Sequence, residues 1–184
     1  MKTEQQYFEE AKTMQIYMEE MATHKEASFS IYEQFEVPKD GFVEKLKKAN
    51  VHILAITEDW CGDAMLNNPI IRKVAEEANV EVRAVLRDAD TALIDRYLTN
   101  GGRAIPIYLV LNEAGEVITT WGPRAPELQR MVEEGRVALP DKDHPNFDAA
   151  TKAFYTNLTK SYAEDPQLWH YVYESFKNTL LQNL

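Results

Sequence analysis

The sequence predicts an α/β fold with a central sheet, and three observations support this prediction. Strand and helix signals alternate from Val51 to about Arg136, which is the pattern that a sheet covered by helices requires. Both flanks carry apolar residues at helical spacing. The chain has 184 residues, of which 45% are apolar, so it is long enough to bury one core. We therefore expect one compact domain with helical additions at both ends.

Each element of the alternating region has a local reason to form. Short runs rich in β-branched residues predict strands. A helix ends where Asn100 and Gly101 supply the left-handed conformation, and another begins at Pro126, because proline suits the first turn of a helix. In chain order we expect a strand at Val51–Thr57, a helix at Asp63–Asn79 interrupted by Pro69, a strand at Glu81–Leu86, a helix at Thr91–Thr99, a hairpin of Ile107–Leu111 and Glu116–Trp121, and a helix from Pro126.

The flanks are expected to be helical and to pack on this core. The predicted helices are Glu4–His24, Phe147–Tyr162 and Pro166–Leu181. A cofactor or lipid pocket and a homodimer face are the other uses that such aromatic helix faces allow. The expected organisation is an N-terminal helical extension (1–38), an α/β core (39–136) and a C-terminal helical extension (137–184), together forming one domain.

Charge and composition exclude several classes of function. The net charge is −10, the pI is about 4.9, and the cations are scattered, so nucleic acid is not an expected partner. The longest apolar run, 104–111, is too short to span a membrane, and the amino terminus does not resemble a secretory signal. The four histidines show no metal-ligand spacing. We expect a soluble, cytoplasmic protein without membrane contact or a bound metal.

Cys61 is the only cysteine, so the chain cannot form an internal disulfide. It follows a strand and a short loop and precedes a helix, whose dipole lowers the pKa of a thiol at its amino end. The prediction is an accessible Cys61 with a pKa below the roughly 8.5 of a free thiol. A buried, inert cysteine is the alternative.

The surroundings of Cys61 resemble the active site of the thioredoxin-like family, in a bacterial, monothiol form. The matching features are Trp60-Cys61-Gly62 as the start of a Trp-Cys-Gly-Pro-Cys motif, Pro69 as the proline of the active-site helix, Arg103 to Pro106 as the segment of the cis-proline, and Gly122 after the last strand. The resemblance covers about Lys39 to Arg136. It implies a thioredoxin fold, with a central mixed sheet flanked by helices, and a cis Ile105–Pro106 peptide facing the thiol across a substrate groove.

Three departures from the family pattern limit what this site can do. Ala64 replaces the second cysteine, so Cys61 has no resolving thiol. Ala55 replaces a buried aspartate that assists proton transfer in thioredoxins. Asp63 replaces the proline of the motif; it is expected to cap the helix, although its charge also opposes a thiolate. Arg124 is expected to be a surface charge rather than an anion contact.

The leading functional hypothesis is a monothiol redox protein in which Cys61 attacks mixed disulfides between client proteins and small thiols. An external low-molecular-weight thiol would regenerate it as co-substrate, and no cofactor is required. Two alternatives remain open: a peptide- or protein-binding module with an incidental cysteine, and an oxidant sensor. The resemblance implies substrate-binding positions around the catalytic Cys61, namely Trp60, Gly62, Asp63, Ala64, Ile105, Pro106 and Gly122.

Overall fold

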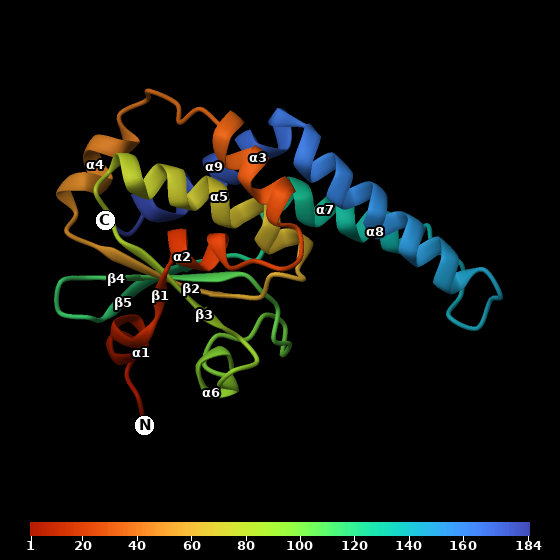
Figure 1. The fold of residues 1–184 in the computed structure, drawn as a ribbon, viewed down its shortest axis with the longest axis horizontal. Coiled ribbons are helices and arrows are strands. Elements are labelled where there is room, and N and C mark those ends of the chain that lie inside the picture. The colour runs from red at the N-terminus through yellow and green to blue at the C-terminus, as the bar shows by residue number, and fades with distance from the viewer.

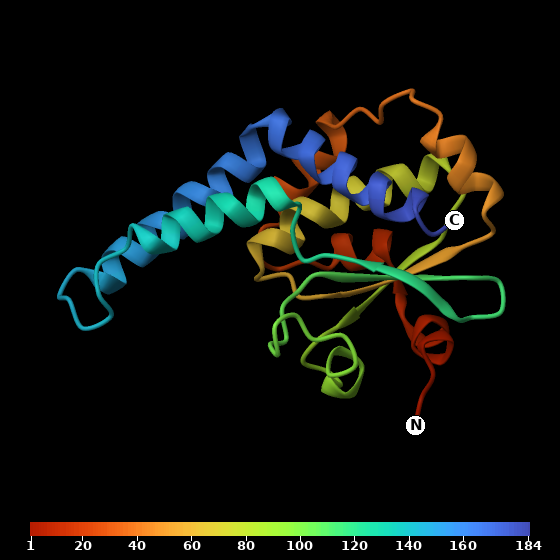
Figure 2. The ribbon, with the colours of Figure 1, turned by 180° about the vertical axis from the view of Figure 1, so that it is seen from behind.

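The computed structural model describes all residues from Met1 to Leu184 as a five-stranded mixed sheet with helices on both faces (Figures 1 and 2). The strands lie in the order β1-β3-β2-β4-β5, with β2 and β3 parallel and the other neighbours antiparallel. The strands are β1 (Lys12–Thr13), β2 (His52–Thr57), β3 (Val82–Leu86), β4 (Ile107–Leu111) and β5 (Val117–Trp121). The helices are α1 (Glu4–Glu10), α2 (Met14–Glu19), α3 (Lys25–Gln34), α4 (Phe42–Lys48), α5 (Gly62–Glu77), α6 (Thr91–Ile94), α7 (Pro126–Val137), α8 (Phe147–Glu164) and α9 (Pro166–Leu181).

The two faces of the sheet bury separate cores, because successive side chains of a strand point to opposite sides. In β2, Ile53 and Ala55 belong to a core of 35 buried residues shared with α5 and α9. Leu54 and Ile56 belong to a second core of 10 buried residues shared with α1 and α6. The larger core anchors α5, whose amino terminus carries the cysteine.

Helices α7 and α8 form a hairpin that extends beyond the end of the sheet (Figures 1 and 2). Close packing between the two helices occurs at Gly135, where an added Cβ would lie 2.0 Å from the ring of Phe154. The inner end of α8 returns to the sheet domain, because Leu158 and Tyr162 are buried in the larger core. This return brings α8 to the amino terminus of α5.

The predicted α/β core is present, and the differences lie mainly at the amino terminus. Instead of one helix over Glu4–His24, the chain forms α1, β1 and α2. Thr13 ends the extended segment by accepting a hydrogen bond from the Ile16 N–H, and Lys12 and Thr13 pair with β3. The helix at Thr91 is also shorter than predicted and ends at Ile94. Pro69 does not interrupt α5, which is continuous from Gly62 to Glu77. None of the helices combines the length and apolar character needed to cross a membrane.

Candidate functional site

Cys61 lies at the carboxyl end of β2, directly before α5. It is the N-cap residue of that helix: its backbone is extended, and its carbonyl accepts the first helical hydrogen bond, from the Met65 N–H at 3.0 Å. Two acids hold the preceding loop. Glu58 accepts from the Asp88 N–H at 3.0 Å, and Asp59 accepts from the Ala22 N–H at 2.8 Å. The thiol is therefore fixed where strand and helix meet.

The segment of Ile105 and Pro106 faces this thiol. The peptide bond between them is cis, the geometry that the resemblance implies. The Cys61 S–H donates to the Ile105 carbonyl, with the sulfur 3.6 Å from the oxygen. Gly122 packs behind the loop so closely that an added Cβ would lie 2.3 Å from the Pro106 carbonyl oxygen. The three residues thus position the backbone opposite Cys61.

The prediction of an activated thiol is wrong. Burial, and after it the negative charge of Asp63, raise the pKa of Cys61 to about 11. Hydrogen bonds from the Ala64 and Asp63 N–H groups and the positive charge of Arg124 act in the opposite direction without outweighing burial. The helix terminus has the predicted effect, but desolvation dominates it, so Cys61 is a neutral thiol in the free protein.

Asp63 and Arg124 differ from expectation in the same way, because they form a buried network instead of a cap and a surface charge. Arg124 Nη2 lies 2.8 Å from one carboxylate oxygen of Asp63, and the Tyr162 hydroxyl donates to the other at 2.9 Å. The side chains of Asp63 and Arg124 are only 11% and 15% exposed. A carboxylate buried to this degree requires such partners, and no side chain caps α5.

A cleft of about 420 Å³ opens beside Cys61, between the start of α5 and the inner face of α8. An added Cβ on Gly62 would lie 2.7 Å from the Thr159 methyl group, so α8 directly covers the residue after the cysteine. Trp60 stands at this cleft with half of its surface exposed, and the Arg87 guanidinium lies 5.1 Å from its ring centroid. The cleft is a small partly covered hollow, not an open groove along the sheet.

The structure brings together only part of the predicted site. Trp60, Cys61, Gly62 and Asp63 line the cleft, whereas Ala64, Ile105, Pro106 and Gly122 do not. Ala64 and Ile105 are buried, with 1% and 5% exposure, and Ile105 belongs to the smaller core. The lining residues that sequence reasoning missed are His24, Arg124, Lys152, Tyr155, Thr156, Leu158, Thr159 and Tyr162. Most of them recur on α8 at spacings of three or four, a signal that one face of this helix meets a site.

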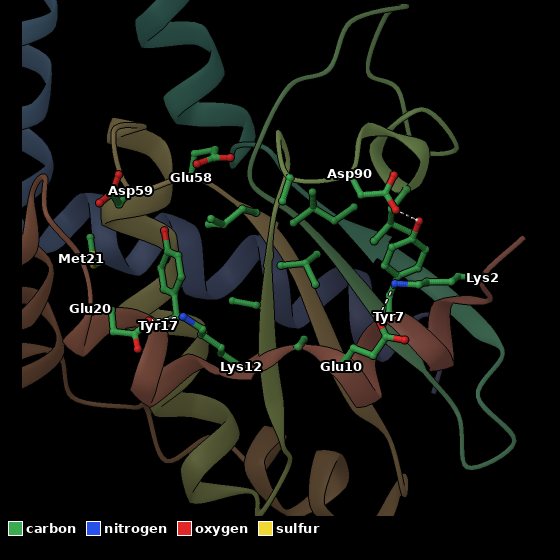
Figure 3. A pocket seen from close by; sticks show the side chains of 17 residues that line it. Lys2, Tyr7, Glu10, Lys12, Tyr17, Glu20, Met21, Glu58, Asp59 and Asp90 are labelled. Atoms are coloured by element: carbon green, nitrogen blue, oxygen red, sulfur yellow. Dashed lines mark hydrogen bonds and ion pairs between the residues drawn. The ribbon is translucent and has the colours of Figure 1, made fainter.

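A second cavity, of about 380 Å³, lies around the ends of β2 and β3 (Figure 3). Its polar groups satisfy one another: Tyr7 donates to Asp90 at 2.6 Å, and Lys2 pairs with Glu10. Glu58 and Asp59 point toward it but serve the backbone contacts given above. It contains no thiol, so the cleft at Cys61 is the better candidate for chemistry. No group of three metal-ligating side chains lies close enough to hold a metal ion.

The mixed sheet, the helix that begins after the cysteine and the facing cis-proline define a protein of the thioredoxin fold. A family model described as Thioredoxin matches residues 11–138, and the chain belongs to this family. The matched region starts well before Lys39 and includes β1, which sequence reasoning assigned to a helical extension.

Two solved structures have a similar fold over the whole chain. A crystal structure of an HIV epitope scaffold is 17% identical with a TM-score of 0.68, and the match covers 100% of both chains. A protein of unknown function from Pseudomonas aeruginosa is 18% identical with a TM-score of 0.63, with 97% of this chain and 99% of that chain covered. At these identities they show the fold alone. No curated protein sequence matches the chain.

Proposed function

We propose that this protein is a monothiol thiol–disulfide oxidoreductase that acts through Cys61. The observation that carries the proposal is the placement of the single sulfur: Cys61 lies at the start of a 16-residue helix, 3.6 Å from the Ile105 carbonyl, and opens on a cleft. Membership of the thioredoxin family supports the same chemistry. Without a second cysteine, the reaction has to be completed by a thiol from outside the chain.

The proposed cycle has two exchange steps. Cys61 loses its proton to solvent and its sulfur attacks the small-thiol sulfur of a mixed disulfide. A new bond to Cys61 forms, the old sulfur–sulfur bond breaks, and the client sulfur leaves with the electron pair and takes up a proton. An external thiolate then attacks the small-thiol sulfur, which frees Cys61 and yields a small-molecule disulfide. Overall, one external thiol is consumed: the client sulfur is released as a thiol, and the external sulfur takes its place in the disulfide with the small thiol.

The raised pKa sets the rate at which the free protein can start this cycle. With a pKa of about 11, only about one Cys61 in ten thousand is a thiolate at pH 7. The more basic thiolate is also the better nucleophile, which recovers part of the loss. Together these effects make Cys61 about twentyfold slower than a free cysteine at neutral pH. The proposed cycle therefore depends on binding in the cleft to favour the attack.

A binding module with an incidental cysteine is the second candidate, and the same pKa favours it. A neutral, largely buried thiol needs no reaction to explain it, and the exposed Trp60 offers a contact surface beside the cleft. The two functions differ in whether they require the sulfur of Cys61. Replacing it abolishes exchange but leaves binding intact.

The test is a turnover assay with a cysteine-containing peptide capped by glutathione, with reduced glutathione in excess. The wild-type protein should release the peptide thiol faster than buffer alone, whereas Cys61→Ser, which keeps the size of the side chain, should not. Fluorescence titration of the capped peptide on both proteins reports binding. Equal release by both proteins with unchanged binding would reject the oxidoreductase and leave the binding module.

A further inference from the structure

The charge of the cleft beside Cys61 is opposite in sign to that of the whole chain. Its charged lining consists of Arg124 and Lys152 against a single acid, Asp63, which gives a net charge of +1 in a chain of net charge −10. The second cavity has the opposite balance, with two lysines against five acids. The surface surrounding the thiol is therefore locally favourable to an anion.

Of the two cations, only Lys152 forms no ion pair within the chain. Arg124 is occupied by Asp63, at 2.8 Å, and by the Gln129 side chain, also at 2.8 Å. The ion pairs of the chain do not involve Lys152. Lys152 is exposed and lines the cleft from α8. An acidic group that enters the cleft would find Lys152 as its charge partner.

The dimensions of the cleft indicate a small ligand. A volume of about 420 Å³ lies within the range of pockets that bury small molecules. The Thr159 methyl group packs against Gly62, so α8 covers the cleft at this point. Tyr155 and Thr156 add hydroxyl groups along the same wall. The small-thiol half of a mixed disulfide fits here better than the protein half.

Building on the proposed function, we propose that this cleft binds the low-molecular-weight half of the mixed disulfide, and that it selects a thiol bearing a carboxylate or similar anionic group through Lys152. The selected molecule places its sulfur next to Cys61 and its acidic group toward α8. Neutral thiols of the same length react without this charge contact, and cationic ones meet repulsion.

Three symmetric aliphatic disulfides test the proposal: dithiodipropionate (anionic), hydroxyethyl disulfide (neutral) and cystamine (cationic). Formation of the Cys61 adduct is followed by intact mass at low ionic strength, and each rate is divided by the rate of the same probe with mercaptoethanol. The anionic probe should react roughly two- to fivefold faster than the neutral one, the effect of one exposed charge pair. Cystamine should be slowest, and added salt should shrink the differences.

Variants of two lysines on the same helix locate the effect. Lys152→Gln should bring the anionic and neutral rates together. Lys160→Gln removes an equal charge from α8 outside the cleft and should retain the preference. Equal corrected rates for all probes, or a preference that survives Lys152→Gln, would overturn the inference while leaving the oxidoreductase standing. Absence of any adduct would instead reject the oxidoreductase, and the inference with it.

Discussion

Asp63→Asn should make Cys61 more acidic, and this is the sharpest consequence of the buried network. Asp63 is the largest charge effect raising the pKa of Cys61, second only to burial itself. Asparagine keeps the shape and an oxygen that can accept from the Tyr162 hydroxyl, but it removes the negative charge. It also frees Arg124, which then stabilises a thiolate more strongly.

The size of the effect follows from one charge in a largely buried site. Removing such a like charge lowers the pKa of Cys61 by about one unit, or about 1.4 kcal/mol. At pH 8 the thiolate population rises about tenfold. The less basic thiolate is about threefold less reactive, so the observed alkylation rate rises only about threefold.

The assay is the rate of Cys61 alkylation by iodoacetamide from pH 7 to 11, measured by intact mass. Tyr162→Phe is the matched control, because it breaks a hydrogen bond of the same network and leaves the charge of Asp63 in place. In Tyr162→Phe the pKa of Cys61 should not fall. An unchanged or higher pKa in Asp63→Asn would refute the electrostatic reasoning.

Three further predictions concern stability and geometry. The pKa of Cys61 is raised on folding, so the stability that its neutral form provides is present below about pH 8.5 and is lost as the pH rises to about 11. In urea unfolding over this range, the free energy of unfolding of the wild type should fall by about 3 kcal/mol relative to that of Cys61→Ala. Gly122→Ala should lower the free energy of unfolding by about 3 kcal/mol or more in the same assay, because the φ of Gly122 is +123° and the new Cβ meets the Pro106 carbonyl oxygen. The control Gly41→Ala should lower it by only about 1 kcal/mol, because Gly41 has a φ of +89° but open space around it. Ala64→Cys should lose both free thiols as an oxidised monomer, since positions three apart at a helix start have α-carbons about 5 Å apart; two remaining free thiols would contradict the helix start at Gly62.

The parts of the fold that depend on local pattern were predictable. The strands β2 to β5 and helix α5 follow from runs of β-branched residues and helical spacing between turn signals. The break between α1 and α2 was not, because Lys12 and Thr13 become extended by pairing with β3, about 70 residues away in the sequence. A short edge strand of this kind has no pattern of its own.

The candidate site was predictable in position but not in environment. The Trp60-Cys61-Gly62 motif located the thiol at the end of β2. Its pKa depends on burial of the thiol against the smaller core, and Asp63 depends on Tyr162, which lies 99 positions further along the chain. Local sequence shows the favourable helix terminus, whereas desolvation of the thiol by the folded chain appears only in three dimensions.

The most direct test of the oxidoreductase is a single exchange at Cys61 in the native chain. The protein is incubated at pH 8.5 with excess hydroxyethyl disulfide, whose neutrality separates this test from the charge preference, and is followed by intact mass. We predict one adduct on wild type, none on Cys61→Ser, and its complete release by an added small thiol. Failure of the native chain to form the adduct, while the urea-unfolded chain is fully modified, would contradict the account and leave Cys61 as an inert buried thiol.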